Sequence, residues 1–329
     1  MDILKKKYPV LDILTESFNA FWKNLKGLYI IQLLLMVAVM IMSIPYLYSF
    51  FGVFLTSGLD FNNPQAMDPA AAEALFKQMF SPAMIVYLVV AMLAYVVFAL
   101  VQKAAVSIYL QERILGREIT ILDAFKRGLP RAWSLFITAV VFLIILYAPI
   151  ILIILAGSVA KELMGLLIFV WFIALFFGVF FFIPLVQVVV LKGKSLIDAL
   201  KYCVKLVKPT YWPTMGFMFL IMAIAFALMI GLSIVNGITQ AIFGLLAAAT
   251  QSIPVLSVIF VAVSVIISFL IMLIPYCYMD VPFVLYYMNR EVYFGDGQGE
   301  LAELAKQNAP AEVDVNLMPA PPQAQEPQN

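Results

Sequence analysis

The sequence predicts an all-α integral membrane protein with six transmembrane helices. Hydrophobic residues make up 64% of the 329 residues and charged residues only 12%, whereas soluble domains are roughly half apolar and a quarter charged. The mean hydropathy of +1.03 agrees with this. Six stretches of about 20 residues, the length that crosses a bilayer core, carry almost no charge. The charges gather between these stretches.

The six predicted spans are apolar runs near residues 28–47, 83–102, 133–155, 166–188, 212–235 and 255–274. Each contains enough Leu, Ile, Phe and Val to offset one polar residue such as Gln32, since each of these side chains favours insertion by about 0.3–0.6 kcal/mol. The chain therefore divides into three parts. Residues 1–27 form a cytosolic amphipathic segment, 28–290 the six-helix membrane domain, and 291–329 a cytosolic tail. The tail is first acidic and then rich in Pro, Gln and Ala, which predicts disorder.

Lysine and arginine predict the orientation of the spans. They are abundant in the N-terminal segment and in the second and fourth connections, which we therefore place in the cytosol. The first and third connections hold one lysine each, and the fifth, 236–254, holds no charge. Both termini are thus expected to be cytosolic. Three tryptophans stand where the odd-numbered spans enter from the cytosol, as expected for indoles at headgroup level: Trp22, Trp133 and Trp212.

The outer connections are predicted to contain only short ordered elements. In the first of them, Asp68 followed by Pro69 indicates a short helix over 70–78. The dipeptide Ser81-Pro82 then begins the second span.

A triplet of an acidic, a small and an apolar residue occurs three times. The copies are Glu16-Ser17-Phe18, Asp123-Ala124-Phe125 and Asp198-Ala199-Leu200, and each precedes a pair of predicted spans. Thr120 and Ser195 stand three residues before the acidic residue of the second and third copies, which is the spacing of a helix N-cap. Pro130 and Pro209 are expected to end or bend the two helices that follow.

On a helical projection, residues 196–208 separate into two faces. The polar face carries Asp198, Lys201, Tyr202, Lys205 and Lys208, and the apolar face carries the rest. A basic amphipathic helix of this kind lies in the membrane interface with its lysines toward anionic headgroups. The sequence therefore predicts three hairpins, each preceded by a cytosolic in-plane amphipathic helix.

These amphipathic helices have two interpretations. They either only anchor and orient the hairpins, or they form a surface that binds lipid or docks a protein partner on the cytosolic side. In the second interpretation the contacts come from basic residues of all three copies: Lys23, Lys126, Arg127, Lys201, Lys205 and Lys208.

The repeated triplets, the lysine-rich faces and the polar turn Lys192-Gly193-Lys194-Ser195 resemble the membrane domain that is fused to some bacterial glycerophosphodiester phosphodiesterases, over about residues 10–290. In the fused members a separate soluble barrel carries the activity, and this chain has no room for it. The resemblance implies a stand-alone relative in the bacterial inner membrane, without the catalytic domain.

The composition argues against an enzyme. The chain has no histidine, which excludes Ser-His and Cys-His dyads and removes the usual zinc ligand. Cys203 and Cys277 form no Cys-x-x-Cys motif, so we expect free thiols. Phosphate-binding glycine loops and metal-ligand clusters are also missing from the sequence. We therefore expect neither catalysis nor a cofactor, a metal or a nucleic-acid partner.

Asp280 and Gln187 support an alternative, a small-solute or lipid transporter with its site between the hairpins. An acidic group in a membrane span is a functional candidate by default, but Asp280 lies near the cytosolic end of its span, where an ion pair with Lys103 explains it equally well. Gln102, Gln187 and Asp280 end even-numbered spans and can line a cavity together. Pro184 and Pro275 are expected to bend spans four and six.

Overall fold

The computed structural model describes residues 10–56, 73, 77, 80–157, 161–250 and 254–295. Of these residues 94% are helical and none is in a strand, which confirms the all-α class. Six helices are long and apolar enough to cross a membrane, as predicted. Most of the predicted helix at 70–78 and of the tail at 291–329 lies outside the described residues. Glu73 and Lys77 are described, are helical, and form an ion pair of 2.6 Å.

The long helices are α1 (Val10–Thr56), α3 (Pro82–Ile114), α4 (Ile121–Gly157), α5 (Lys161–Val179), α8 (Tyr211–Ala249) and α9 (Pro254–Phe294). Between α5 and α8 lie five short elements: the 3-10 turn η3 (Phe180–Phe182), α6 (Leu185–Gln187), the π-helix η4 (Val188–Lys192), α7 (Leu196–Val207) and the 3-10 turn η5 (Lys208–Thr210).

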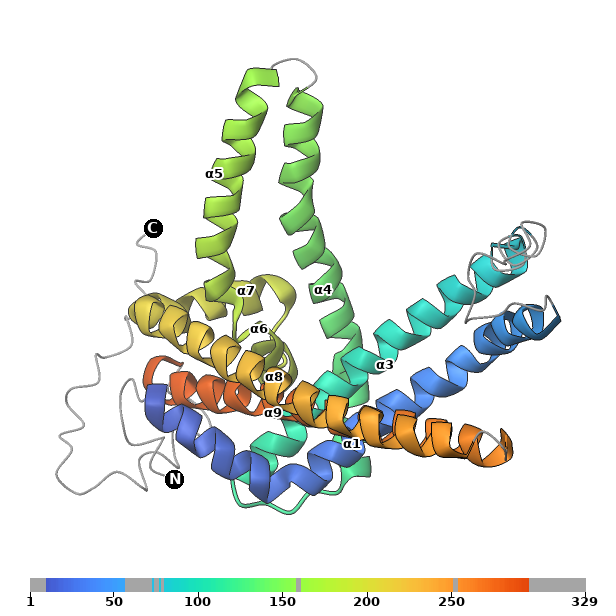
Figure 1. Cartoon of the computed structure of the whole chain (residues 1–329). Coiled ribbons are helices and arrows are strands. Elements are labelled where there is room, and N and C mark those ends of the chain that lie inside the picture. The colour runs from blue at the N-terminus through green and yellow to red at the C-terminus, as the bar shows by residue number, and fades with distance from the viewer. Residues whose placement is uncertain are drawn as a thin grey trace, which may run out of the picture.

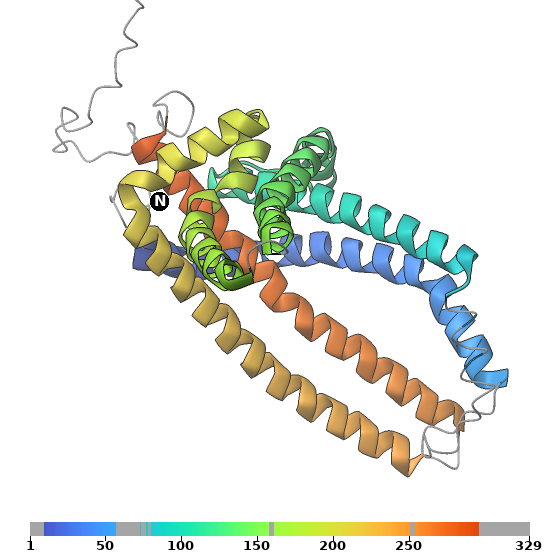
Figure 2. The same ribbon diagram turned by 90° about the horizontal axis from the view of Figure 1, so that it is seen from above.

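The helices converge at one end of the molecule and diverge from it in pairs (Figures 1 and 2). α8 lies along α9, α1 along α3, and α4 beside α5, and the α4–α5 pair points away from the other two. Almost all buried side chains belong to the convergent end, which consists of residues 10–35, 101–138, 180–221 and 273–294 and is called the base below. The diverging parts expose Leu, Ile, Val and Phe side chains, as expected for surfaces that face lipid.

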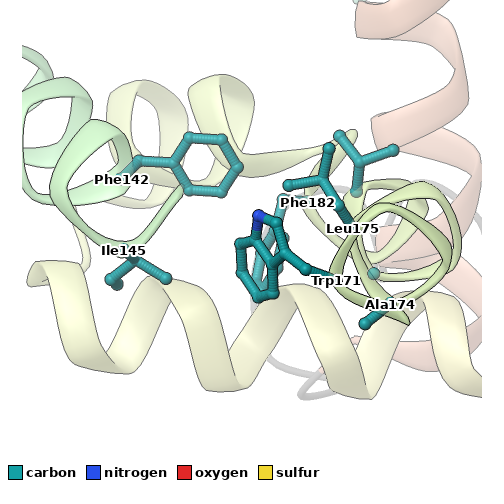
Figure 3. A pocket seen from close by; sticks show the side chains of 8 residues that line it. Phe142, Ile145, Trp171, Ala174, Leu175 and Phe182 are labelled. Carbon is teal, nitrogen blue, oxygen red and sulfur yellow. The ribbon is translucent and has the colours of Figure 1, made fainter. Parts of the chain in front are cut away.

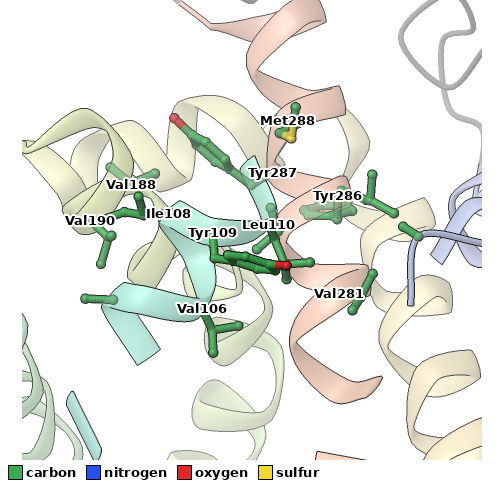
Figure 4. Close-up of a cluster of buried hydrophobic side chains, with 14 of the residues drawn as sticks. Val106, Ile108, Tyr109, Leu110, Val188, Val190, Val281, Tyr286, Tyr287 and Met288 are labelled. Carbon is green, nitrogen blue, oxygen red and sulfur yellow. The ribbon is translucent and has the colours of Figure 1, made fainter. Parts of the chain in front are cut away.

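The C-terminal half of α9 occupies the centre of the base. Its residues from Val281 to Val292 are nearly all buried, and Tyr286, Tyr287 and Met288 pack beside residues 106–110 of α3 (Figure 4). Phe217 of α8 stacks on Tyr286 with a ring separation of 4.7 Å. The contacts of α9 therefore tie α3, α7 and α8 into one packed unit.

The three triplets occupy equivalent positions in the base. Their small residues, Ser17, Ala124 and Ala199, are all fully buried, while the acidic residues before them are not. Gly128, four residues after Ala124, lets α4 approach α3, because a Cβ there would stand 3.0 Å from the backbone nitrogen of Ala105. A small residue is thus required where the helix meets its neighbour closely.

The predicted helix starts are largely present. Ser81 caps α3, with Pro82 as the first helical residue. The backbone N–H of Asp123 donates to the Thr120 hydroxyl at 3.1 Å, which is the expected cap. Ser195 also occupies the N-cap position of α7, but its hydroxyl bonds to the carboxylate of Asp198 at 2.6 Å instead of to the backbone.

The prolines have different effects. α7 ends before Pro209 and α5 is interrupted before Pro184, as predicted. Pro130, expected to end or bend its helix, lies inside α4 and does not end it, and Pro275, expected to bend its span, lies inside α9. For Pro130 the reason is exposure: the carbonyl of Lys126 that loses its helical donor lies at the surface, where water can satisfy it.

Three further predictions need correction. The interruption at 180–184 means that residues 166–188 are not one helix. Residues 236–249, predicted as a connection, continue α8, because this charge-free run is rich in Ala, Leu and Ile. Tyr202, assigned to the polar face of its helix, is buried against the base.

Candidate functional site

The outer face of α7 combines basic and apolar side chains. Lys201, Lys205 and Lys208 are exposed, and Ile197 and Val204 are exposed beside them. The opposite face packs on the base through Ala199, Cys203, Leu206 and Val207. The base therefore holds α7 so that its cations and two large apolar side chains face outward together.

The other two copies show the same combination. In α4, Lys126 and Arg127 are exposed next to Leu129, and in α1, Lys23 is exposed next to Trp22. Trp22, Trp133 and Trp212 are 66%, 67% and 67% exposed, so none of the three indoles is needed to fill the core. Indoles exposed beside cations fit the boundary between headgroups and acyl chains.

A buried carboxylate anchors α7 from behind. The hydroxyl of Tyr202 donates to both carboxylate oxygens of Glu291 on α9 at 2.9 Å, and the ammonium group of Lys192 forms an ion pair with the same carboxylate. The ammonium groups of Lys194 and Lys205 lie 4.2 and 5.7 Å from the centre of the Tyr202 ring. Tyr202 therefore joins the basic turn before α7 to the centre of the base.

Asp280 pairs with Lys103, as one of the two interpretations of its position predicted. The ammonium group of Lys103 on α3 contacts the Asp280 carboxylate on α9. The neighbouring residue on α3, Gln102, hydrogen-bonds to Gln32 of α1. These two adjacent residues of α3 hold α1 and α9 by polar contacts, so Asp280 has a structural role independent of any transport.

Gln187 lies apart from this pair. It is 6% exposed and, within the described part of the chain, its side-chain oxygen has no hydrogen-bond partner. It lies between the break at Pro184 and the π-helix η4, an irregularity that often accompanies functional sites. Among the described residues no hydrogen bond joins Gln187 to Asp280 or Gln102, so the predicted three-residue cavity is not assembled by direct contacts.

An apolar cavity of about 100 Å³ lies between α4 and α5. Phe142 and Ile145 of α4 face Trp171 and Leu175 of α5 across it (Figure 3). The indole nitrogen of Trp171 has no hydrogen-bond partner among the described residues. The walls of the cavity carry no titratable group, so the cavity can hold an apolar chain but has no side chain that could act as an acid, a base or a nucleophile.

The part of the chain that the structure describes contains no cluster of three or more Cys, Asp or Glu side chains able to hold a metal ion. Cys203 and Cys277 are free, as predicted, and both are buried. The exposed cations beside exposed apolar side chains are suited to binding.

Sequence reasoning missed Glu291 and the partners of Tyr202. Glu291 stands at the boundary drawn between the membrane domain and the acidic tail, and its position there suggested solvent exposure. The available signal was the apolar and aromatic run 281–294, in which Glu291 and Arg290 are the only charged residues. Charges within such a run need partners inside the protein, and both residues are buried.

Comparison of this chain with protein-family models, curated protein sequences and solved structures finds no match.

Proposed function

We propose that this chain is a non-enzymatic protein of the bacterial inner membrane that binds anionic lipid headgroups through its basic surface. The basic surface consists of Lys23, Lys126, Arg127, Lys201, Lys205 and Lys208. The proposal includes three transmembrane hairpins, each preceded by an in-plane helix, with both termini in the cytosol. It also includes kinship with the membrane domain fused to bacterial glycerophosphodiester phosphodiesterases.

The observation that carries the proposal is the outer face of α7. Three exposed lysines and the exposed side chains of Ile197 and Val204 share one side of a helix whose other side is fixed to the base. Each lysine close to an anionic membrane surface contributes about 1 kcal/mol, so three together account for about a hundred-fold in affinity. Apolar neighbours add burial in the acyl boundary.

The test is native mass spectrometry of the full chain extracted gently with its own lipids. We expect the wild type to retain anionic phospholipid, and the triple variant Lys201→Glu/Lys205→Glu/Lys208→Glu to lose it. The matched control replaces the same lysines by arginine, which keeps the charge and should keep the lipid. A second control is Lys77→Glu, an exposed lysine outside the basic surface.

Each result has a definite meaning. Equal lipid retention by wild type and the triple Glu variant refutes lipid binding by α7. Loss of a bound protein of defined mass, with lipid unchanged, makes the basic surface a docking site for a cytosolic partner instead.

A second candidate function is lipid or small-solute transport, favoured by the unpartnered side-chain oxygen of Gln187 beside the interrupted helix. In proteoliposomes containing a fluorescent phosphatidylglycerol analogue, transport would equilibrate the label between leaflets. The variants Gln187→Leu and Asp280→Asn should then slow this exchange. Unchanged exchange in both variants would argue against a site at these residues.

A further inference from the structure

A second cavity, polar and larger than the first, lies where three elements of the base meet. Its volume is about 410 Å³, which is within the range of small-molecule sites. Residues of α3, α4 and η4 line it: Ile108, Gln111, Glu112, Arg127, Pro130, Arg131, Val190 and Leu191. One part of the wall is charged and the rest is apolar.

The charges in the wall are not balanced. The two oxygens of Glu112 are both engaged, one by Arg127 at 2.9 Å and the other by Arg117 at 3.3 Å. Arg131 lies one helical turn after Arg127, on the same face of α4. Among the described residues no carboxylate pairs with Arg131. The wall itself holds two arginines and one glutamate, and Arg117 beside it adds a third positive charge, so the cluster carries a positive excess.

The Arg131 guanidinium lies against the turn after η4. Gly193 adopts a left-handed conformation with φ +65°, and a Cβ at this position would stand 2.3 Å from Nη1 of Arg131. The guanidinium of this exposed arginine therefore occupies space beside the turn that glycine leaves open. Its N–H groups remain accessible to a ligand in the cavity.

We infer that this cavity binds a phosphate group, with Arg131 as its principal ligand. A guanidinium presents two parallel N–H groups that match two phosphate oxygens, and the positive excess of the cluster favours an anion. Ile108, Val190 and Leu191 supply an apolar wall for the carbon atoms attached to the phosphate. Trp133, exposed two residues after Arg131, fits the headgroup level, where phospholipids supply such groups.

This inference goes beyond the proposed function. A phosphate group can occupy the cavity whether or not the lysines of α7 bind lipid, because none of those lysines lines it; Arg127 alone belongs to both the basic surface and the cavity wall. The same chemistry is available from a phospholipid headgroup or from free phosphate, and the experiment separates these two sources.

The experiment measures occupancy by hydrogen–deuterium exchange of segments 127–131 and 190–193 in the full chain. One arm uses phosphatidylcholine nanodiscs with and without phosphatidylglycerol, and the other adds inorganic phosphate to phosphatidylcholine nanodiscs. The variants are Arg131→Gln and Arg131→Lys. The matched control is Lys77→Gln, which removes an exposed cation that belongs neither to the basic surface nor to the cavity wall.

We expect phosphatidylglycerol to protect both segments in the wild type and in Lys77→Gln. Arg131→Gln should need about ten-fold more phosphatidylglycerol to reach the same protection. Arg131→Lys keeps the charge but loses the two parallel N–H groups, so the lipid that it needs should lie between the amounts for the wild type and Arg131→Gln. Protection by inorganic phosphate, lost in the same variants, would identify free phosphate as a ligand too.

The inference is overturned if Arg131→Gln responds as the wild type does in both arms. It is also overturned if neither ligand protects the wild type. The triple Glu variant of α7 separates the two proposals: cavity protection that persists in it, while lipid retention is lost, shows two independent sites.

Discussion

The hydroxyl of Tyr202 donates to both carboxylate oxygens of Glu291 at 2.9 Å, across 89 residues of sequence. This contact joins α7, which carries the exposed lysines, to the buried C-terminal half of α9. The carboxylate also pairs with Lys192, whose side chain is 22% exposed against 6% for Glu291. The orientation of the basic face thus depends on an acid in the centre of the base.

Removing the acceptor should cost more than removing the donor. Tyr202→Phe leaves Glu291 paired with Lys192, so we expect a loss of about 1 kcal/mol in the free energy of unfolding. Glu291→Leu leaves Lys192 and the Tyr202 hydroxyl facing an apolar side chain, so we expect the free energy of unfolding to fall by about 3 kcal/mol. Unfolding in mixed detergent micelles measures both. Equal losses would mean that the tyrosine, not the ion pair, holds the carboxylate.

The same contact shows where sequence patterns stop being informative. The triplet repeat correctly placed Ala199 and Cys203 on one side of α7, because the period of a helix fixes which residues share a face. It could not place Tyr202, since a helical projection separates polar from apolar side chains and ignores partners elsewhere in the chain. Only the fold reveals that Glu291 reaches the tyrosine hydroxyl.

Charge pairing was predictable where both residues end apolar runs. Lys103 follows about 20 apolar residues and Asp280 about 25, so both were expected at the cytosolic interface, and their pairing was one of the two interpretations of Asp280. Arg131 offered no such signal. Its place in a cavity depends on the left-handed turn at Gly193, which lies 62 residues further along the chain than Arg131 and is brought close only by packing of η4 on α4.

Lys103 and Asp280 differ in burial, and their variants should differ accordingly. The Lys103 side chain is 49% exposed and that of Asp280 only 11%. Lys103→Met leaves the Asp280 carboxylate, which is largely shielded from water, without its ion-pair partner. In Asp280→Asn the ammonium group of Lys103 can turn to solvent. We expect the free energy of unfolding to fall by about 2–3 kcal/mol in Lys103→Met and by about 1 kcal/mol in Asp280→Asn. Double-mutant cycles with Lys103→Met/Asp280→Asn should show coupling of about 1 kcal/mol, and additive losses would exclude a direct interaction.

The small residues of the triplets should tolerate no enlargement. Ala124→Leu and Ala199→Leu place three extra carbon atoms at fully buried sites, so each should lower the free energy of unfolding by about 1–3 kcal/mol. The matched control is Thr15→Leu. Thr15 precedes the first triplet, is exposed, and corresponds to Leu122 and Ile197, which are also exposed. A control that is as destabilised as the two variants would contradict the equivalence of the three copies.

Gly27 of α1 lies directly against the side chain of Tyr109 of α3. A Cβ on Gly27 would stand 2.1 Å from the hydroxyl oxygen and 2.4 Å from the adjoining ring carbon of Tyr109, which is 4% exposed. The ring has to move, and it is buried, so Gly27→Ala should lower the free energy of unfolding by about 1–3 kcal/mol.

Gly216 of α8 is the matched control for this prediction, because a Cβ there meets no atom within 4 Å. Gly216→Ala should be neutral or stabilising by up to about 1 kcal/mol, through helix propensity alone. Truncating the ring in Gly27→Ala/Tyr109→Leu should make the alanine substitution nearly neutral relative to Tyr109→Leu alone. The measurement is again unfolding in mixed micelles. If Gly27→Ala lowers the free energy of unfolding as much in the Tyr109→Leu background as in the wild type, the destabilisation comes from the backbone of α1 and not from the tyrosine ring.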